Sequence, residues 1–233
     1  ISMRYNVAND YHSHYNLDST IDRRNIMKKI IYLEASPRKS RSHSKRVAEA
    51  YLDKVKENDS NVEIKKIDIW EYNLPEFNGP MMDAKYAVIG GQDPSKEQQD
   101  AWGEVTNIFN EFADADHYVL SVPMWNFNIP YKLKHFIDIV TQPGLSWSFN
   151  PDDGYKGLMT GRTATVIYAS GDGYGDGTGF ESFDLQKPYV ELWLTFIGFE
   201  KIEKVIADRT LFSPEEAEAK AMDVALKLSL IHI

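Results

Sequence analysis

Two periodicities of apolar and polar residues alternate along the chain, one typical of strands and one typical of helices. Residues 28–35 (KKIIYLEA) and 117–123 (HYVLSVP) are short runs of apolar, β-branched and aromatic residues, which predict strands. Residues 42–55 follow the first run and predict a helix, because their apolar residues recur at helical spacing. These apolar residues are Val47, Ala48, Tyr51, Leu52 and Val55.

The rest of the chain continues this alternation. Residues 62–69 (VEIKKIDI) alternate between apolar and polar, which predicts a strand at a sheet edge. The last helix has a clear start, with Ser213 as N-cap, Pro214 at its first position and acidic residues in its first turn. Residues 75–83 (PEFNGPMMD) predict a loop. The other predicted strands are 162–170 and 199–207, and the other predicted helices are 94–115, 129–140, 183–197 and 213–230.

Strands that alternate with helices imply a mostly parallel sheet with helices on both faces. Five strands favour a flavodoxin-like, doubly wound α/β fold with strand order 2-1-3-4-5 over a six-stranded dinucleotide-binding fold. Ligands of such sheets bind at the carboxyl ends of the strands, near the switch point between strands 1 and 3. The loops after the first, third and fourth predicted strands are therefore the candidate site.

Composition narrows the class of protein. The chain has 233 residues, 42% hydrophobic and 26% charged, as in ordinary globular proteins. A formal charge of -9 argues against nucleic acid as the main partner. The absence of cysteine excludes disulfides and thiolate catalysis and fits the cytoplasm. No apolar run approaches the roughly 18 residues of a membrane helix.

The two ends of the chain show neither periodicity. Residues 1–26 lack an apolar signal core, and we expect them to be a non-catalytic N-terminal extension. Residues 231–233 are expected to be a short tail. A single domain at 27–230 then contains every predicted strand and helix.

The loop after the first strand carries hydroxyl and basic side chains. Residues 36–44 (SPRKSRSHS) contain neither a P-loop nor a G-x-G-x-x-G motif. A helix that begins near Ser42 directs free N–H groups and the positive end of its dipole at this loop, where Ser36 and Ser44 add hydroxyls. This pattern favours a cradle for a phosphate monoester, with Arg38 and Arg41 as added charge. The alternative is plain helix capping by Ser42 beside a solvated basic loop.

The loop after the third strand is apolar and aromatic. Residues 123–130 (PMWNFNIP) place Trp125 and Phe127 between two prolines. Such a surface costs free energy when it is left in water, so we expect it to cover a flat ligand. Asn126 and the backbone N–H groups would add polar contacts. The alternative is burial against a partner subunit.

The loop after the fourth strand is rich in glycine. Five of the ten residues in 170–179 (SGDGYGDGTG) are glycine, which permits either close approach of the backbone to a ligand or mobility. The D-G-Y-G-D-G pattern lacks the spacing and the terminal glutamate of an EF-hand, so we expect no metal here.

Together these motifs resemble the FMN-dependent NADH:quinone oxidoreductases, also called FMN-dependent NADH-azoreductases. The resemblance covers residues 28–228 and rests on S-P-R-(x)3-S-x-S after the first strand, P-M-W-N-F-N-I-P after the third and S-G-x-G after the fourth. The middle motif is the most specific, because the family's form is P-M-[YW]-N-F. Residues 157–173 resemble the family's approach to the fourth strand, and residues 188–199 (PYVELWLTFIGF) resemble its dimer-forming helix.

The resemblance implies an FMN-binding domain at 27–230 and assigns its contacts residue by residue. The serine at the end of the first strand would bind FMN, and the S-x-S segment would hold its phosphate. We expect the middle residue of that segment to contribute only its backbone N–H, with its ring at the surface; the alternative is a bond from its side chain to the phosphate. These positions are Ser36 for the strand end and Ser42, His43 and Ser44 for the S-x-S segment.

The other two motifs would surround the isoalloxazine ring of FMN. The residues along the ring would be Pro123, Met124, Trp125, Asn126 and Phe127. The residues at its pyrimidine edge would be Ser170, Gly171, Asp172 and Gly173. Some members of the family carry Arg or His in this last loop. Their absence here leaves the preferred substrate open.

The activity that the resemblance implies is two-electron transfer in a ping-pong cycle. NADH or NADPH would deliver a hydride to FMN, and a quinone or an azo compound would then take the electrons. Backbone N–H groups of 170–173 would offset the negative charge of the reduced flavin. No side chain needs to act as acid or base, because water can supply the protons. The resemblance also implies a homodimer with its sites at the interface.

Other functions stay open beside this one. A flavodoxin-type electron carrier would bind FMN without oxidising NADH, and a general NAD(P)H:FMN reductase would use free flavin as acceptor. A response-regulator-type domain is disfavoured, because it needs an acidic cluster at the strand ends and the first strand here ends in Glu-Ala-Ser.

Overall fold

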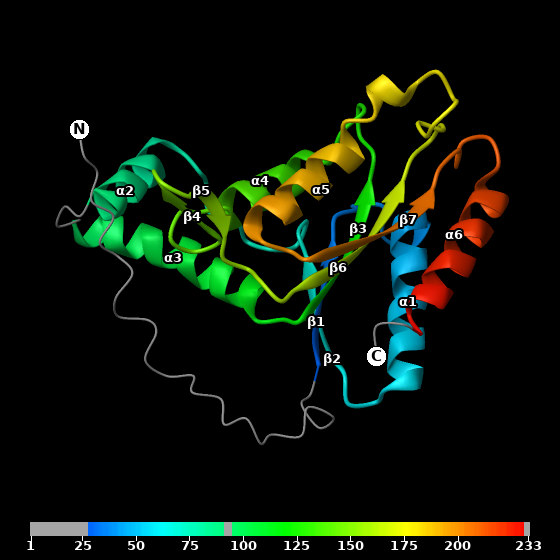
Figure 1. Ribbon diagram of the computed structural model, residues 1–233, viewed down its shortest axis with the longest axis horizontal. Helices are drawn as coiled ribbons and strands as arrows, with labels where there is room; N and C mark the ends of the chain where they lie inside the picture. Colours follow the sequence, from blue (N-terminus) through cyan, green and yellow to red (C-terminus); the bar gives the residue numbers. More distant parts are fainter. Residues whose placement is uncertain (1–27, 91–94, 231–233) are drawn as a thin grey trace.

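A parallel five-stranded sheet forms the centre of the molecule (Figure 1). The computed structural model describes residues 28–90 and 95–230, and the predictions for 1–26 and 231–233 lie outside this part. The sheet has the order β2-β1-β3-β6-β7, and all its neighbouring strands are parallel. Its strands are β1 (Lys29–Glu34), β2 (Glu63–Asp68), β3 (His117–Pro123), β6 (Thr163–Ala169) and β7 (Lys201–Ala207).

The strand order differs from the predicted 2-1-3-4-5 and reads 2-1-3-6-7. Two strands that the sequence analysis missed, β4 (Trp147–Asn150) and β5 (Gly154–Gly157), precede β6 and form an antiparallel hairpin separate from the main sheet. Each has four residues, too few to show a period. Its aromatic residues Phe149 and Tyr155 are exposed, so no buried face marks the hairpin in the sequence.

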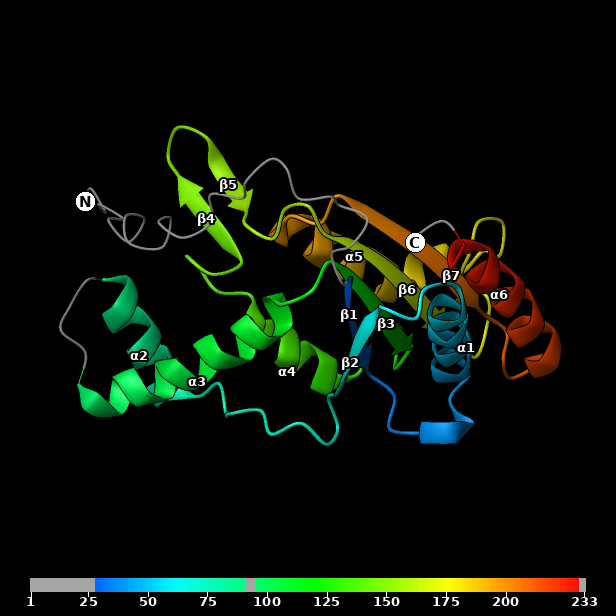
Figure 2. The ribbon, with the colours of Figure 1, turned by 90° about the horizontal axis from the view of Figure 1, so that it is seen from below.

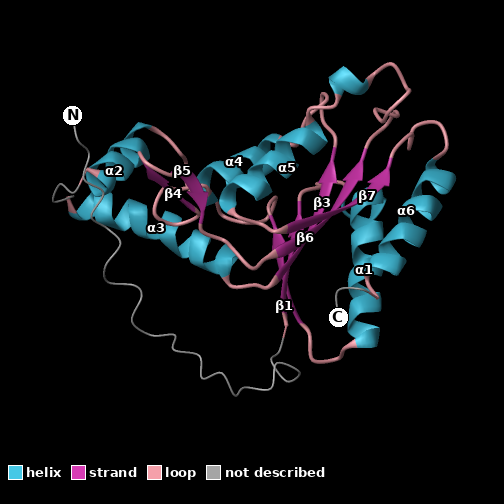
Figure 3. Ribbon diagram, viewed as in Figure 1, coloured by secondary structure: helices cyan, strands magenta, loops and turns pink. Residues whose placement is uncertain are grey.

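Helices cover both faces of the sheet (Figures 2 and 3). One face packs against α1 (His43–Asn58) and α6 (Pro214–Leu228). The other packs against α3 (Lys96–Ala113), α4 (Tyr131–Val140) and α5 (Gln186–Ile197). Alternate residues of β1 pack into the hydrophobic cores on the two faces of the sheet, because successive side chains of a strand point to opposite faces. All five residues predicted for the apolar face of the first helix are buried, which confirms that prediction.

Several helix boundaries differ from the prediction, and α4 and α5 begin two and three residues later than predicted. The segment predicted as a loop around residue 80 begins a helix, α2 (Gly79–Ile89), whose Pro80 lies in the first turn, where proline is tolerated. Helix α3 begins at Lys96, after an N-cap by Ser95 that forms a capping box with Gln98. Among the helices of the described residues, none combines the length and apolarity needed to cross a bilayer.

Candidate functional site

The three predicted loops meet at one edge of the sheet. At the end of β1, the Ala35 N–H donates to the Ser121 carbonyl of β3 at 3.1 Å. At the end of β3, the Met124 N–H donates to the Ala169 carbonyl of β6 at 2.7 Å. This edge is the switch point of the sheet, because β1 has β2 on one side and β3 on the other. The structure thus brings the three sets of predicted site residues together.

The first loop buries its hydroxyl groups at the start of α1. Ser36, Ser42 and Ser44 are all buried, and the Oγ atoms of Ser42 and Ser44 lie 3.2 Å apart. Ser42 caps the helix by accepting from the Lys45 N–H at 3.3 Å. Within the described residues, the N–H groups of His43 and Ser44 donate to no protein acceptor. Helix capping and a free pair of donors therefore occur together at this helix end.

The first loop carries three cations in different surroundings. Arg38 and Arg41 are exposed. Between them Lys39 has a φ of 50°, a left-handed conformation that is uncommon for lysine. Its ammonium lies 2.5 Å from Asp68 and 2.8 Å from Glu71. These carboxylates raise the pKa of Lys39 and hold the loop against the end of β2.

A buried carboxylate lies at the base of the first loop. Glu34 ends β1, and its Oε2 accepts from the ammonium of Lys45 at 2.8 Å and that of Lys66 at 2.5 Å. Glu34 Oε1 has no partner in the part of the chain that the structure describes. Burial opposes the charge of Lys45, but its bonds to Glu34 and Glu49 outweigh burial and raise the pKa of its ammonium. Lys45 therefore ties the first turn of α1 to β1.

The ring of His43 is only partly exposed and is held by another residue, whereas the prediction placed it free at the surface. Its side chain is 15% exposed, and its Nδ1 lies 2.9 Å from Glu218 Oε2 in α6. The sequence analysis missed Glu218 because it lies 175 residues away from His43 and reads as part of the solvated face of a helix.

The second loop is a tight turn with two free donors. Trp125 and Asn128 exchange backbone hydrogen bonds of 2.7 and 2.9 Å. The residues between them, Asn126 and Phe127, have φ of 46° and 70°, as in a type I′ turn. Such backbone costs about 1–3 kcal/mol for a residue like Phe and persists mainly at functional sites. In the described part of the chain, the N–H groups of Asn126 and Phe127 have no acceptor.

An aromatic residue that the sequence analysis missed supports this turn. Trp70 follows β2, and its indole N–H donates to the Ala35 carbonyl at 3.0 Å. Its ring lies 5.5 Å from that of Trp125 and 5.4 Å from that of Tyr131. A tryptophan directly after an edge strand was the only signal in the sequence. Trp70 links the first loop to the second.

The other side of the turn is open. Phe127 is 45% exposed, and its ring lies 5.2 Å from Phe183 and 6.2 Å from Tyr174. Phe183 is 46% exposed. These rings form an apolar surface that solvent reaches, beside the free N–H groups of the turn.

The third loop uses part of its polarity internally. Ser170 Oγ donates to the Asp172 carbonyl at 2.7 Å, and the Gly173 N–H donates to Asp172 Oδ1 at 2.7 Å. A Cβ on Gly171 would lie 2.7 Å from Leu211, so this glycine admits the loop after β7. In the described residues the N–H groups of Gly171 and Asp172 have no acceptor. Two of the four predicted residues thus offer a free backbone donor.

The residues present fit a flavin mononucleotide. A phosphate needs several donors at one point, and the first loop supplies two N–H groups and two hydroxyls at a helix start. A flavin ring needs an apolar surface with donors at its polar edge. The second and third loops supply both, through exposed aromatic rings and two pairs of free N–H groups.

Comparison with known proteins identifies the family. A family described as Flavodoxin-like fold matches residues 28–229. The chain is 50% identical over 185 residues to an FMN-dependent NADH:quinone oxidoreductase of Desulfotalea psychrophila, covering 79% of this chain and 87% of the relative. The chain belongs to the family of FMN-dependent NADH:quinone oxidoreductases. A member from Nitratidesulfovibrio vulgaris (strain DP4) is 41% identical over 208 residues and is covered to 99%.

Solved structures agree with this assignment to the oxidoreductase family. An FMN-dependent NADH-azoreductase from Bacillus anthracis, solved in complex with FMN, superposes with a TM-score of 0.80 at 26% identity, over 88% of this chain and 99% of that one. An azoreductase from Bacillus anthracis str. Sterne gives a TM-score of 0.80 at 25% identity, over 87% of this chain. Membership confirms the resemblance and the flavodoxin-like fold. The assignment of individual FMN contacts stays a prediction.

Proposed function

We propose that this protein is an FMN-dependent oxidoreductase that passes two electrons from NADH or NADPH to quinones or azo compounds. The observation that carries the proposal is the start of α1, where two buried serine hydroxyls lie beside two backbone N–H groups without an acceptor in the described residues. The names of the relatives, FMN-dependent NADH:quinone oxidoreductases and azoreductases, support the same activity. A cytoplasmic location and a single FMN-binding domain at 27–230 are part of the proposal.

The first loop would anchor the phosphate. Ser42 and Ser44 would donate to it from their hydroxyls, and the N–H groups of His43 and Ser44, which have no acceptor in the described residues, would donate from the helix start. Ser36 lies at the end of β1, where it would contact the chain that joins the phosphate to the ring. Lys39 and Lys45 are already paired with carboxylates, so we assign phosphate binding to hydroxyl and backbone donors rather than to these lysines.

The second and third loops would orient the ring. When bound, FMN supplies the redox chemistry, which is transfer of a hydride and then of electrons. The N–H groups of Asn126 and Phe127 would hold one polar edge of the ring, and those of Gly171 and Asp172 would face negative charge on the other. Asp172 bonds to its own loop, and the other predicted contacts carry no carboxylate. The protons for the acceptor would therefore come from water.

We also propose a homodimer that uses α5 and the β4–β5 hairpin. Tyr155 is 66% exposed and its ring lies 5.8 Å from that of Phe196 in α5, while Leu192 of the same helix is 68% exposed. An apolar surface of this kind suits a partner subunit. Trp193 of α5 is buried and belongs to the core. Light scattering should give twice the chain mass. A monomer with full activity at micromolar concentration would contradict the dimer.

The test of function is the absorption spectrum of the protein, before and after FMN is added and the excess removed. We expect bound flavin whose visible bands are bleached by NADH without oxygen and restored by a quinone. A bound flavin that neither NADH nor NADPH bleaches would instead indicate an electron carrier. Failure to retain flavin after reconstitution would show that the loop at α1 does not hold FMN.

A further inference from the structure

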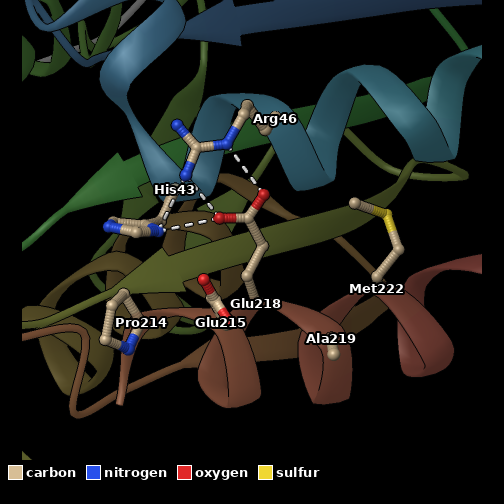
Figure 4. Close-up of a pocket in the computed structure, with 7 residues that line it drawn as sticks. All are labelled: His43, Arg46, Pro214, Glu215, Glu218, Ala219 and Met222. Atoms are coloured by element: carbon tan, nitrogen blue, oxygen red, sulfur yellow. Dashed lines mark hydrogen bonds and ion pairs between the residues drawn. The ribbon is translucent and has the colours of Figure 1, made fainter. Parts of the chain in front are cut away.

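A polar cluster joins the first turn of α1 to α6, and His43 is its one member among the residues predicted to contact FMN. Glu218 of α6 accepts from Arg46 Nε at 2.7 Å through its Oε1, and its Oε2 contacts the Nη2 of the same guanidinium. His43 Nδ1 lies 2.9 Å from Glu218 Oε2 and 3.0 Å from Arg46 Nη2. The tautomer with its hydrogen on Nδ1 donates to the carboxylate, and the other tautomer accepts from the guanidinium that this carboxylate holds. Figure 4 shows how the histidine and the arginine converge on this one carboxylate.

The cluster extends into the first loop. Arg46 Nη1 donates to the Ser40 carbonyl at 2.8 Å, two residues before the helix cap. Glu218 therefore holds the loop at two points. Through the ring it holds His43, whose backbone N–H is one of the free donors. Through Arg46 it holds the turn that leads into Ser42.

The side chains of His43 and Arg46 border open space on one side. A surface cavity of ≈ 400 Å³ adjoins the cluster and is lined by both His43 and Arg46. Without Glu218 the ring and the guanidinium would have room to take other rotamers, because this cavity is open beside them. The hydrogen bond from Arg46 lowers the pKa of Glu218, and that from His43 lowers it further, against the effect of burial. Glu218 is thus charged at neutral pH.

We propose that Glu218 is a positioning residue for the phosphate-binding loop. Acting through His43 and Arg46, it orients the N–H groups of His43 and Ser44 before the phosphate arrives. A binding site that is ordered in advance loses less conformational entropy when its ligand binds. This inference rests on the proposed function, because it assigns a role in FMN binding at the same loop.

The test is a comparison of FMN with riboflavin, which lacks the phosphate. Dissociation constants of both flavins would be measured by flavin fluorescence on the full chain freed of flavin. For Glu218→Ala we expect the Kd for FMN to rise about tenfold, the lower end of the effect seen when residues that orient metal ligands are removed. The Kd for riboflavin should change less than about twofold. Glu218→Gln, which keeps the size of the side chain, should show the same selectivity with a smaller rise.

Glu215→Gln is the matched control. Glu215 lines the same cavity one turn away, and its side chain contacts neither His43 nor Arg46 in the described structure. Glu215→Gln removes the same charge from the same surface as Glu218→Gln. Because Glu215 does not hold the loop, the Kd of this variant for FMN should stay near that of the wild type. A rise as large as that of Glu218→Ala would mean that charge and not positioning acts here, and would overturn the inference.

The remaining outcomes separate this inference from the proposed function. Equal losses for FMN and riboflavin in both Glu218 variants would indicate a general structural role and overturn the positioning role alone. Unchanged affinity for both flavins would do the same. A wild-type chain that binds no FMN would overturn the proposed function, and this inference with it.

Discussion

The two ends of the proposed FMN site are built in different ways. At the phosphate end, the three serines predicted to bind FMN are buried, and ion pairs from Lys39, Lys45 and Arg46 fasten the loop to β2, β1 and α6. At the ring end, Phe127 and Phe183 are exposed beside a loop in which half of the residues are glycine. One end is fastened from three sides, and the other is open to solvent.

This difference matches two tasks. An anchor for an anion that stays bound gains affinity when its donors are held in position beforehand. A surface that receives NADH and then a quinone or azo compound has to accept different flat molecules in turn, which aromatic rings at an open edge allow. The proposed site is therefore rigid at the phosphate end of FMN and open at its ring end. Changes at the phosphate end should therefore affect retention of FMN, and changes at the ring end should affect turnover.

The largest effect should come from Ser44→Ala. Ser44 is fully buried in the first turn of α1, and its hydroxyl would donate to the phosphate. A hydrogen bond to a charged group contributes about 1.5–3 kcal/mol, so the Kd for FMN should rise by roughly 10- to 100-fold. Fluorescence titration measures it. Ser40→Ala, at an exposed hydroxyl of the same loop, is the control. Equal weakening of riboflavin would contradict a phosphate contact.

A smaller effect is expected where Trp70 links the two ends. Trp70→Phe keeps an aromatic ring beside Trp125 but removes the indole N–H that donates to the Ala35 carbonyl. The free energy of unfolding should fall by about 1 kcal/mol, the usual net contribution of one neutral hydrogen bond. Urea denaturation of the flavin-free chain measures this change. An unchanged midpoint would show that Trp70 does not fasten the first loop.

The pH dependence should sharpen the comparison further. Bonds from Arg46 and His43 lower the pKa of Glu218 from its ordinary value of 4.5. A lowered pKa in the folded state adds stability that is complete above the ordinary value and is lost as the pH falls through the folded pKa. Release of FMN, followed by fluorescence, should therefore increase a few-fold below pH 4.5. Glu218→Gln should not show this increase in FMN release. An identical acid profile in the variant would show that ionisation of Glu218 does not control FMN release.

The smallest effect on stability is expected at the open end. Phe183 is 46% exposed, so Phe183→Ala should change the free energy of unfolding by no more than about 0.5 kcal/mol. FMN should stay bound, while the KM for a quinone rises because an aromatic surface beside Phe127 is lost. Steady-state kinetics at saturating NADH measures this. Loss of FMN from the variant would contradict the separate roles of the two ends, since the open end would then contribute to retention of FMN.

Much of the fold followed from local patterns. Apolar runs such as 117–123 predicted the buried strands, and the helical spacing from Val47 to Val55 predicted the buried face of α1. Strand β4 and its partner β5 escaped because a four-residue strand with exposed aromatic residues has no period to detect. Helix α2 escaped because Gly79 and Pro80 at its start are also common turn residues.

The candidate site was likewise predictable in part. The sequence by itself determined which loops lie at the carboxyl edge of the sheet and placed their serines, aromatic residues and glycines, because these depend on the order of elements along the chain. Only the tertiary structure decided that Glu218 meets His43 and that Trp70 meets Trp125. The reason is physical. Periodicity reports which face of a helix or strand is buried, whereas the packing of α6 on α1 sets which side chains of the two helices meet.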